Sequence, residues 1–75
     1  MQLYAVTISG HKYYFTGKLS EFHIKMIDEF CSTFNERETT TNHKRAFSCL
    51  NNFIRNDLKC NIEFVDMGHI FRINL

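Results

Sequence analysis

The stretch from Asn42 to Cys60, NHKRAFSCLNNFIRNDLKC, has the most regular pattern in this 75-residue chain. Its apolar residues recur at steps of three and four, which places them along one side of a helix with about 3.6 residues per turn. They are Ala46, Phe47, Leu50, Phe53, Ile54 and Leu58. The opposite side is basic and rich in asparagine. We therefore predict an amphipathic helix here, and we expect the other segments to pack against its apolar side.

A second helix is predicted from Ser20 to about Asn35. Ser20 suits the N-cap, and Glu21 follows in the first turn, where the helix dipole favours a carboxylate. The apolar residues again keep helical spacing, and they are Phe22, Met26, Ile27, Phe30 and Phe34. Residues 36–42, ERETTTN, contain no apolar residue and predict a loop that leads to an N-cap at Thr41 or Asn42. A short strand in this loop is an alternative, because threonine favours strands.

The N-terminal segment, residues 3–17, alternates in the manner of a β-hairpin. A two-residue loop at residues 10–11 puts glycine at the first central position, as a type II′ turn requires. This register sets Val6 opposite Phe15 on an apolar face, while the other face is mixed. One face of the hairpin is therefore expected to be buried.

The C-terminal segment, residues 61–75, predicts a second hairpin with its loop at residues 67–68. This pairing sets Phe64 opposite Phe71 on an apolar face. Methionine is a weak choice for a tight hairpin turn, so a longer loop at Met67 is an alternative.

The predicted order of elements is strand, strand, helix, helix, strand, strand (ββααββ) in a single α+β domain covering residues 1–75. A lone hairpin is marginal in water, and each helix has an apolar side to bury. The fold expected from this pattern is a four-stranded antiparallel sheet with both helices on one face. The order of the strands in the sheet does not follow from the sequence.

Charge and cysteine content narrow the class of protein. The formal net charge is +1, but residues 19–41 carry two basic and five acidic residues, while residues 42–60 carry four basic residues and one acidic residue. The three cysteines form no CxxC pair, and no secretory segment precedes them, which indicates reduced thiols in a cytoplasmic protein. No apolar run approaches the roughly 20 residues that a membrane span needs, so no membrane partner is expected.

Catalytic, cofactor and metal sites are not predicted. None of the four histidines, His11, His23, His43 and His69, has a histidine or cysteine neighbour at the spacing of a structural zinc site. The three glycines are isolated, so there is no glycine-rich phosphate loop. An enzyme that uses Asp66 with His69, or one of the thiols, is the residual alternative. A turn capped by the Asp66 side chain is the favoured explanation of that pair.

The face of the sheet opposite the helices is the first candidate binding surface. Apolar side chains there would surround a cross-strand pair of opposite charge, an arrangement typical of an interface core with a polar rim. The predicted partner-binding residues are Tyr14, Thr16, Glu63, Val65, Ile70 and Arg72. The alternative is an ordinary half-solvated sheet face, which tolerates such residues.

The basic side of the helix over residues 42–60 is the second candidate surface. Lysine and arginine neutralise phosphates, and asparagine can pair with adenine edges in a major groove. The predicted nucleic-acid-binding residues are Lys44, Arg45, Asn51, Asn52, Arg55, Asn56 and Lys59. The alternative is an ordinary polar helix face.

These features favour a small non-enzymatic protein-binding module. Phe, Ile, Lys, Asn and Tyr supply 30 of the 75 residues, a bias toward A/T-rich codons that is typical of small accessory proteins of bacteriophages and mobile elements. The leading hypothesis is an inhibitor that occupies the surface of a larger host protein or complex, such as a host enzyme or defence system, with homodimerisation as a further option. A small nucleic-acid-binding regulator is the alternative.

Overall fold

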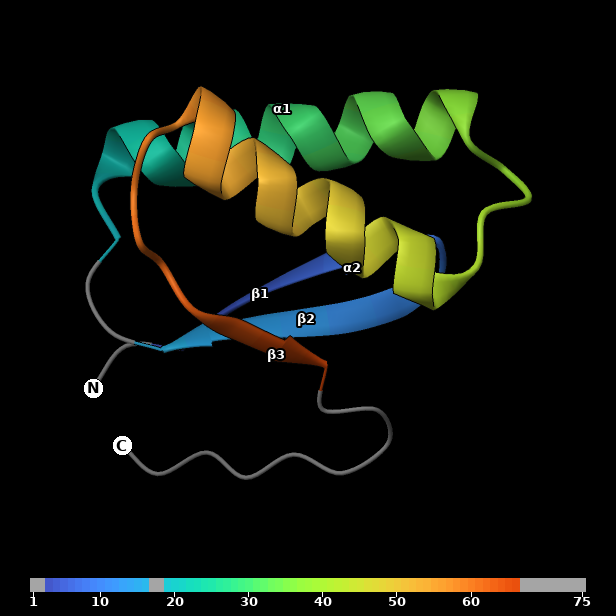
Figure 1. Ribbon diagram of the computed structural model, residues 1–75, viewed down its shortest axis with the longest axis horizontal. Helices are drawn as coiled ribbons and strands as arrows, with labels where there is room; N and C mark the ends of the chain where they lie inside the picture. The colour runs from blue at the N-terminus through green and yellow to red at the C-terminus, as the bar shows by residue number, and fades with distance from the viewer. Residues whose placement is uncertain (1–2, 17–18, 67–75) are drawn as a thin grey trace.

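The computed structural model describes residues 3–16 and 19–66 and is an α+β structure of two layers (Figure 1). One layer is a three-stranded antiparallel sheet, and the helices lie over one face of it. The elements in chain order are β1 (Leu3–Ile8), β2 (His11–Thr16), α1 (Glu21–Arg37), α2 (His43–Asn52), the π-helical turn η1 (Phe53–Asp57) and β3 (Phe64–Asp66).

The β1–β2 hairpin turns at Ser9 and Gly10, one residue earlier than predicted. Both residues have positive φ angles, 53° and 80°, as a type I′ turn requires. Serine accepts this conformation because tertiary contacts hold it: its N–H donates to Asn35 Oδ1 at 2.8 Å, and its hydroxyl donates to the Thr41 carbonyl. The predicted register is therefore wrong by two residues, and Val6 pairs with Tyr13. A slip of two leaves every side chain on its predicted face.

The core lies between the two layers and draws on every element. Its buried residues on the sheet are Val6, Ile8, Tyr13, Phe15 and Phe64, and those on the helices are Ile27, Cys31, Phe34, Ala46, Leu50 and Ile54. On α1 the core begins only at Ile27. Phe22, predicted to belong to the apolar side of this helix, is 62% exposed. At roughly 100° per residue it points well away from the side that carries Ile27, Cys31 and Phe34.

Both predicted helix starts are confirmed. The Ser20 hydroxyl accepts from the His23 N–H at 3.1 Å, and the Asn42 side chain accepts from the Arg45 N–H at 2.9 Å. Asn42 is thus the N-cap of α2, while the neighbouring Thr41 is buried and its hydroxyl donates to Glu38 Oε2 at 3.0 Å. Each cap satisfies a backbone donor that the helix itself leaves without a partner.

The second helix changes its winding before it ends. α2 runs on into η1, where the Leu58 N–H donates to the Phe53 carbonyl at 3.0 Å, five residues back. Lys59 then takes a left-handed conformation with a φ of 53°, and the Cys60 N–H closes onto the Ile54 carbonyl at 3.2 Å. Such π winding is rare and occurs mostly as single turns within α-helices. Ile54, inside η1, is buried in the core.

Within residues 3–16 and 19–66 the sheet has three strands in the order β1-β2-β3, so the predicted four-stranded ββααββ arrangement is wrong. β3 pairs antiparallel with β2, setting Phe64 opposite Phe15. The strand starts only at Phe64 because Ile62, predicted to lie in it, packs against the core on the way from the helix layer to the sheet. The predicted fourth strand, residues 69–73, lies outside the described residues.

One side chain of α1 covers the outer edge of β1. In this hairpin the Ile8–His11 pair flanks the loop, so the backbone groups of Thr7 point away from β2. Asn35 donates from Nδ2 to the Thr7 carbonyl at 2.9 Å and accepts from the Ser9 N–H. An amide side chain thus takes the place of a neighbouring strand, which guards this end of the edge against pairing with another chain.

We predict that Asn35→Ala lowers the free energy of unfolding by about 1–2 kcal/mol, since two hydrogen bonds to backbone groups are lost. Asn52→Ala is the matched control, because Asn52 is an exposed helical asparagine and gains the same helix propensity. Urea denaturation of both variants measures the difference. Equal stability of the two variants would contradict the role assigned to Asn35.

Candidate functional site

Two histidines far apart in the sequence meet where α2 begins. His11 is the first residue of β2, and His43 is the first residue of α2. Their imidazole rings stack with centroids 4.4 Å apart and an interplanar angle of 15°. The Tyr13 hydroxyl donates to the His43 carbonyl at 2.7 Å and so ties the start of the helix to the sheet.

A carboxylate from the third strand joins this pair. Asp66 is the partner of Tyr13 in the β2–β3 ladder, and His11 lies two residues before Tyr13, so both side chains lie on the same face of the sheet. The distance from His11 Nε2 to Asp66 Oδ2 is 4.0 Å. One ligand atom from each of His11, His43 and Asp66 lies within 4.8 Å of the other two. We call these three residues the His–His–Asp cluster.

Tyr13 is the buried support of this cluster. Its side chain is fully buried, and burial, with a smaller contribution from the Asp66 charge, raises the pKa of Tyr13 to about 12. The phenol therefore keeps its proton at neutral pH and remains the donor to the His43 carbonyl.

The sequence prediction of no metal site rested on spacing, and spacing could not find this cluster. His11, His43 and Asp66 are brought together by the turn, by the helix start and by the pairing of β3 with β2, and they have no local motif. The pair that the sequence did suggest, Asp66 with His69, involves a residue outside the described part of the chain. Asp66 lies beside His11.

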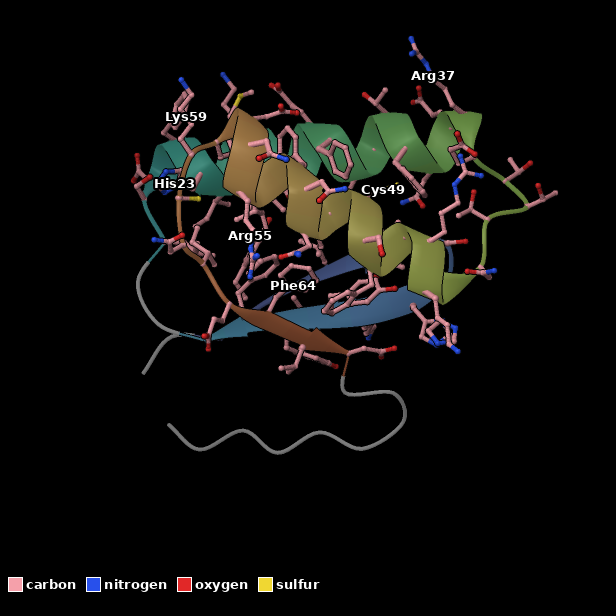
Figure 2. All side chains as sticks on the ribbon, in the orientation of Figure 1. His23, Arg37, Cys49, Arg55, Lys59 and Phe64 are labelled. Atoms are coloured by element: carbon pink, nitrogen blue, oxygen red, sulfur yellow. The ribbon has the colours of Figure 1, made fainter. Side chains whose placement is uncertain are left out.

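A second feature is a groove of about 230 Å³ between the second helix and β3. We call it the α2–β3 groove. Its lining residues are Phe47, Asn51, Arg55, Ile62, Glu63, Phe64 and Val65. In Figure 2 the Arg55 side chain extends from the helix layer toward the part of β3 that carries Phe64. An apolar floor with charged and amide groups at its rim suits a protein contact more than a small polar ligand.

The predicted partner surface on the opposite sheet face is only partly accessible. Val65 is 48% exposed and Glu63 is exposed, but Tyr14 is only 7% exposed and offers little ring surface to a partner. The side chains of Thr16, Ile70 and Arg72 lie outside the described residues, as does the predicted pair between Glu63 and Arg72. Val65 and Glu63 also line the α2–β3 groove. The groove is therefore continuous with the sheet face away from the helices.

The predicted nucleic-acid-binding residues divide into two rows. Asn51 and Arg55 line the α2–β3 groove, whereas Asn52 and Asn56 line a separate groove between α1 and α2. The remaining cations, all exposed, are Lys44, Arg45 and Lys59.

These cations are also spread along the helix layer. Arg45 Nη2 lies 3.6 Å from Glu38 Oε1, so part of the positive charge is already matched within the chain. Lys44 lies in the first turn of α2, and Figure 2 shows Lys59 at the far end of the helix layer. The positive charge is therefore not gathered at the asparagines.

The cysteines are free, and Cys31 is a poor candidate for a nucleophile. Burial, with a smaller contribution from Asp28, raises the pKa of Cys31 to about 12. The thiolate is the reactive form of cysteine, so almost none of the reactive species is present at neutral pH. Cys49 lines the groove between α1 and α2, about 370 Å³ in volume, where the rings of Phe30 and Phe53 stack with centroids 4.3 Å apart.

Comparison with protein-family models, with characterised proteins and with solved structures gave no match for this chain. Across residues 3–16 and 19–66, neither helix has the length and apolar character needed to cross a lipid bilayer. Functional inference therefore rests on the His–His–Asp cluster and the α2–β3 groove themselves.

We predict that Cys31 in the folded protein reacts with iodoacetamide at least about a hundredfold more slowly than in the urea-unfolded chain. Burial lowers the thiolate fraction and also keeps the reagent from reaching the sulfur. Peptide mass spectrometry after timed quenching measures the rate at each cysteine separately. A folded-state rate within tenfold of the unfolded rate would show that Cys31 is accessible and would contradict its place in the core.

Proposed function

We propose that this chain is a small non-enzymatic protein-binding module that acts by occupying a surface of a larger partner. The observation that carries the proposal is the α2–β3 groove together with Val65. Its floor includes the half-buried Phe47 and Ile62, and the exposed Val65 lies at its edge. Arginine and aromatic residues are enriched in interface cores, and Arg55 lies at the rim of this apolar floor.

The size of the domain is compatible with such a role. A standard interface buries about 800 Å² on each partner, and the whole chain exposes 5515 Å². A contact of this size would cover about one seventh of the surface. It would extend from the α2–β3 groove across Val65 onto the sheet face away from the helices, so this contact surface includes the accessible part of the predicted partner surface.

The proposed partner is a larger host protein or complex in the cytoplasm. The composition bias toward A/T-rich codons supports a bacteriophage or mobile-element accessory protein, and inhibition of a host enzyme or defence system is the activity that a surface-blocking module would have. A second copy of the chain is the other protein partner to test, and size-exclusion chromatography with light scattering detects it.

Nucleic acid is the second candidate ligand. Its support is the net charge of +3 over residues 42–60 and the exposure of Lys44, Arg55 and Lys59. Binding of this kind weakens steeply with salt, because phosphate contacts release counterions. The separation of the asparagines into two grooves weighs against base recognition by one helix face.

We predict that affinity purification with the full chain recovers a stoichiometric protein from a host lysate, and that Arg55→Glu and Val65→Asp each reduce recovery at least about tenfold, as expected for residues at an interface core. Arg37→Glu is the matched control, because it makes the same change on an exposed helical arginine at the distant end of α1 (Figure 2). Circular dichroism confirms that the variants fold.

Equal recovery of the partner protein by all three variants would show that the α2–β3 groove is not the contact surface. Failure of the wild type to recover any stoichiometric protein would contradict the proposed function. Nucleic acid in the eluate, lost with Arg55→Glu and at raised salt, would favour the second candidate.

A further inference from the structure

We propose that His11, His43 and Asp66 bind a divalent transition-metal ion, with Zn²⁺ as the ion that the ligand set favours. This proposal is independent of the protein-binding role, because the His–His–Asp cluster lies at the start of α2 and at the end of β3, and none of its residues lines the α2–β3 groove.

The distances fit a three-ligand site after a small contraction. Zinc binds imidazole nitrogen and carboxylate oxygen at about 2.0–2.2 Å in tetrahedral geometry, which sets neighbouring ligand atoms roughly 3.4 Å apart. The ligand atoms of the cluster lie within 4.8 Å of one another, and His11 Nε2 is already 4.0 Å from Asp66 Oδ2. Rotation of the two imidazole rings out of their stacked arrangement would bring their nitrogens close enough to share one ion.

The chemistry of the donors selects among metals. Two imidazoles and one carboxylate suit Zn²⁺, Cu²⁺, Ni²⁺ and Fe²⁺, whereas Ca²⁺ and Mg²⁺ require more oxygen ligands than this cluster supplies. Three protein ligands leave a fourth tetrahedral position for water or for a donor from another molecule.

The surrounding fold fixes the backbone of each ligand residue before metal arrives, so only the side chains must rotate. The Tyr13 hydroxyl fixes the His43 backbone at 2.7 Å, and strand pairing places Asp66 beside Tyr13. His11 is held by its pairing with Ile8 at the hairpin turn. Preorganised ligands lose less conformational freedom when the metal binds, which favours affinity.

Metal binding here would connect three distant parts of the chain: the β1–β2 turn, the start of α2 and the end of β3. A ligand that binds only the folded state stabilises that state by mass action. Small domains with limited cores often depend on such a link. The expected consequence is a Zn²⁺-dependent increase in Tm.

The test is isothermal titration calorimetry of Zn²⁺ into the full chain after treatment with a chelator, in parallel with thermal unfolding. We expect one Zn²⁺ per chain and an increase in Tm. His43→Ala and Asp66→Asn should each weaken affinity by at least about tenfold, since even changes around metal ligands cost 10–100-fold. His23→Ala is the matched control, because His23 lies near the start of α1, at the other end of the molecule (Figure 2).

Four outcomes would overturn the proposal. The first three are no Zn²⁺ binding by the wild type, equal affinity of the wild type and both cluster variants, and an equal loss of affinity in His23→Ala. The fourth is loss of binding in Cys49→Ser or Cys60→Ser, which would assign the metal to thiols. Chemical-shift changes in the imidazole signals of His11 and His43, but not of His23, provide a readout that does not depend on the stability of any variant.

Discussion

The hydrogen bond from the Tyr13 hydroxyl to the His43 carbonyl connects the two layers of this molecule. Tyr13 lies in the middle of β2, and its ring packs against Phe47 of α2 and edge-on against Phe64 of β3. A buried hydroxyl without a partner would cost about 1–3 kcal/mol. The start of α2 is therefore held at one position over the sheet, and Asp66 is placed beside it by strand pairing.

The two edges of the sheet are covered in different ways. This difference explains why the His–His–Asp cluster and the α2–β3 groove both lie near β3. On the β1 side, Asn35 of α1 donates one hydrogen bond to the strand edge and accepts one from the turn, and the Tyr4 hydroxyl donates to Asp28. On the β3 side, the second helix and the sheet leave a groove whose edge carries the exposed Val65. The cluster and the groove both lie along this side, one at the start of α2 and the other farther along the helix.

Local patterns predicted the helices, their caps and the faces of the first hairpin. Ser20 and Asn42 carry short-range signals that tertiary packing does not override, and the alternation around Val6 and Phe15 survives a register slip of two. The slip itself came from Ser9, whose left-handed conformation depends on contacts with residues in α1 and in the following loop. Nothing near Ser9 in the sequence indicates those contacts.

The sheet and the His–His–Asp cluster were less predictable, because both depend on pairing between distant segments. The apolar alternation from Ile62 to Val65 suggested a longer strand, but Ile62 covers the core between the layers. Tyr14 lies on the predicted face of the sheet, opposite Val65, but is only 7% exposed. The cluster could be predicted only if Asp66 were known to pair with Tyr13. The spacing of residues along the sequence does not reveal that pairing.

The most direct test of the central claim is a NOESY spectrum of the wild type and of Tyr13→Phe, focused on the imidazole protons of His11 and His43. The stacked rings, with centroids 4.4 Å apart, should give observable cross-peaks in the wild type. The account predicts that these weaken or vanish in Tyr13→Phe, while contacts of Asn35 with the β1–β2 turn persist. Absence of the cross-peaks in the wild type, or their full retention in Tyr13→Phe, would contradict it.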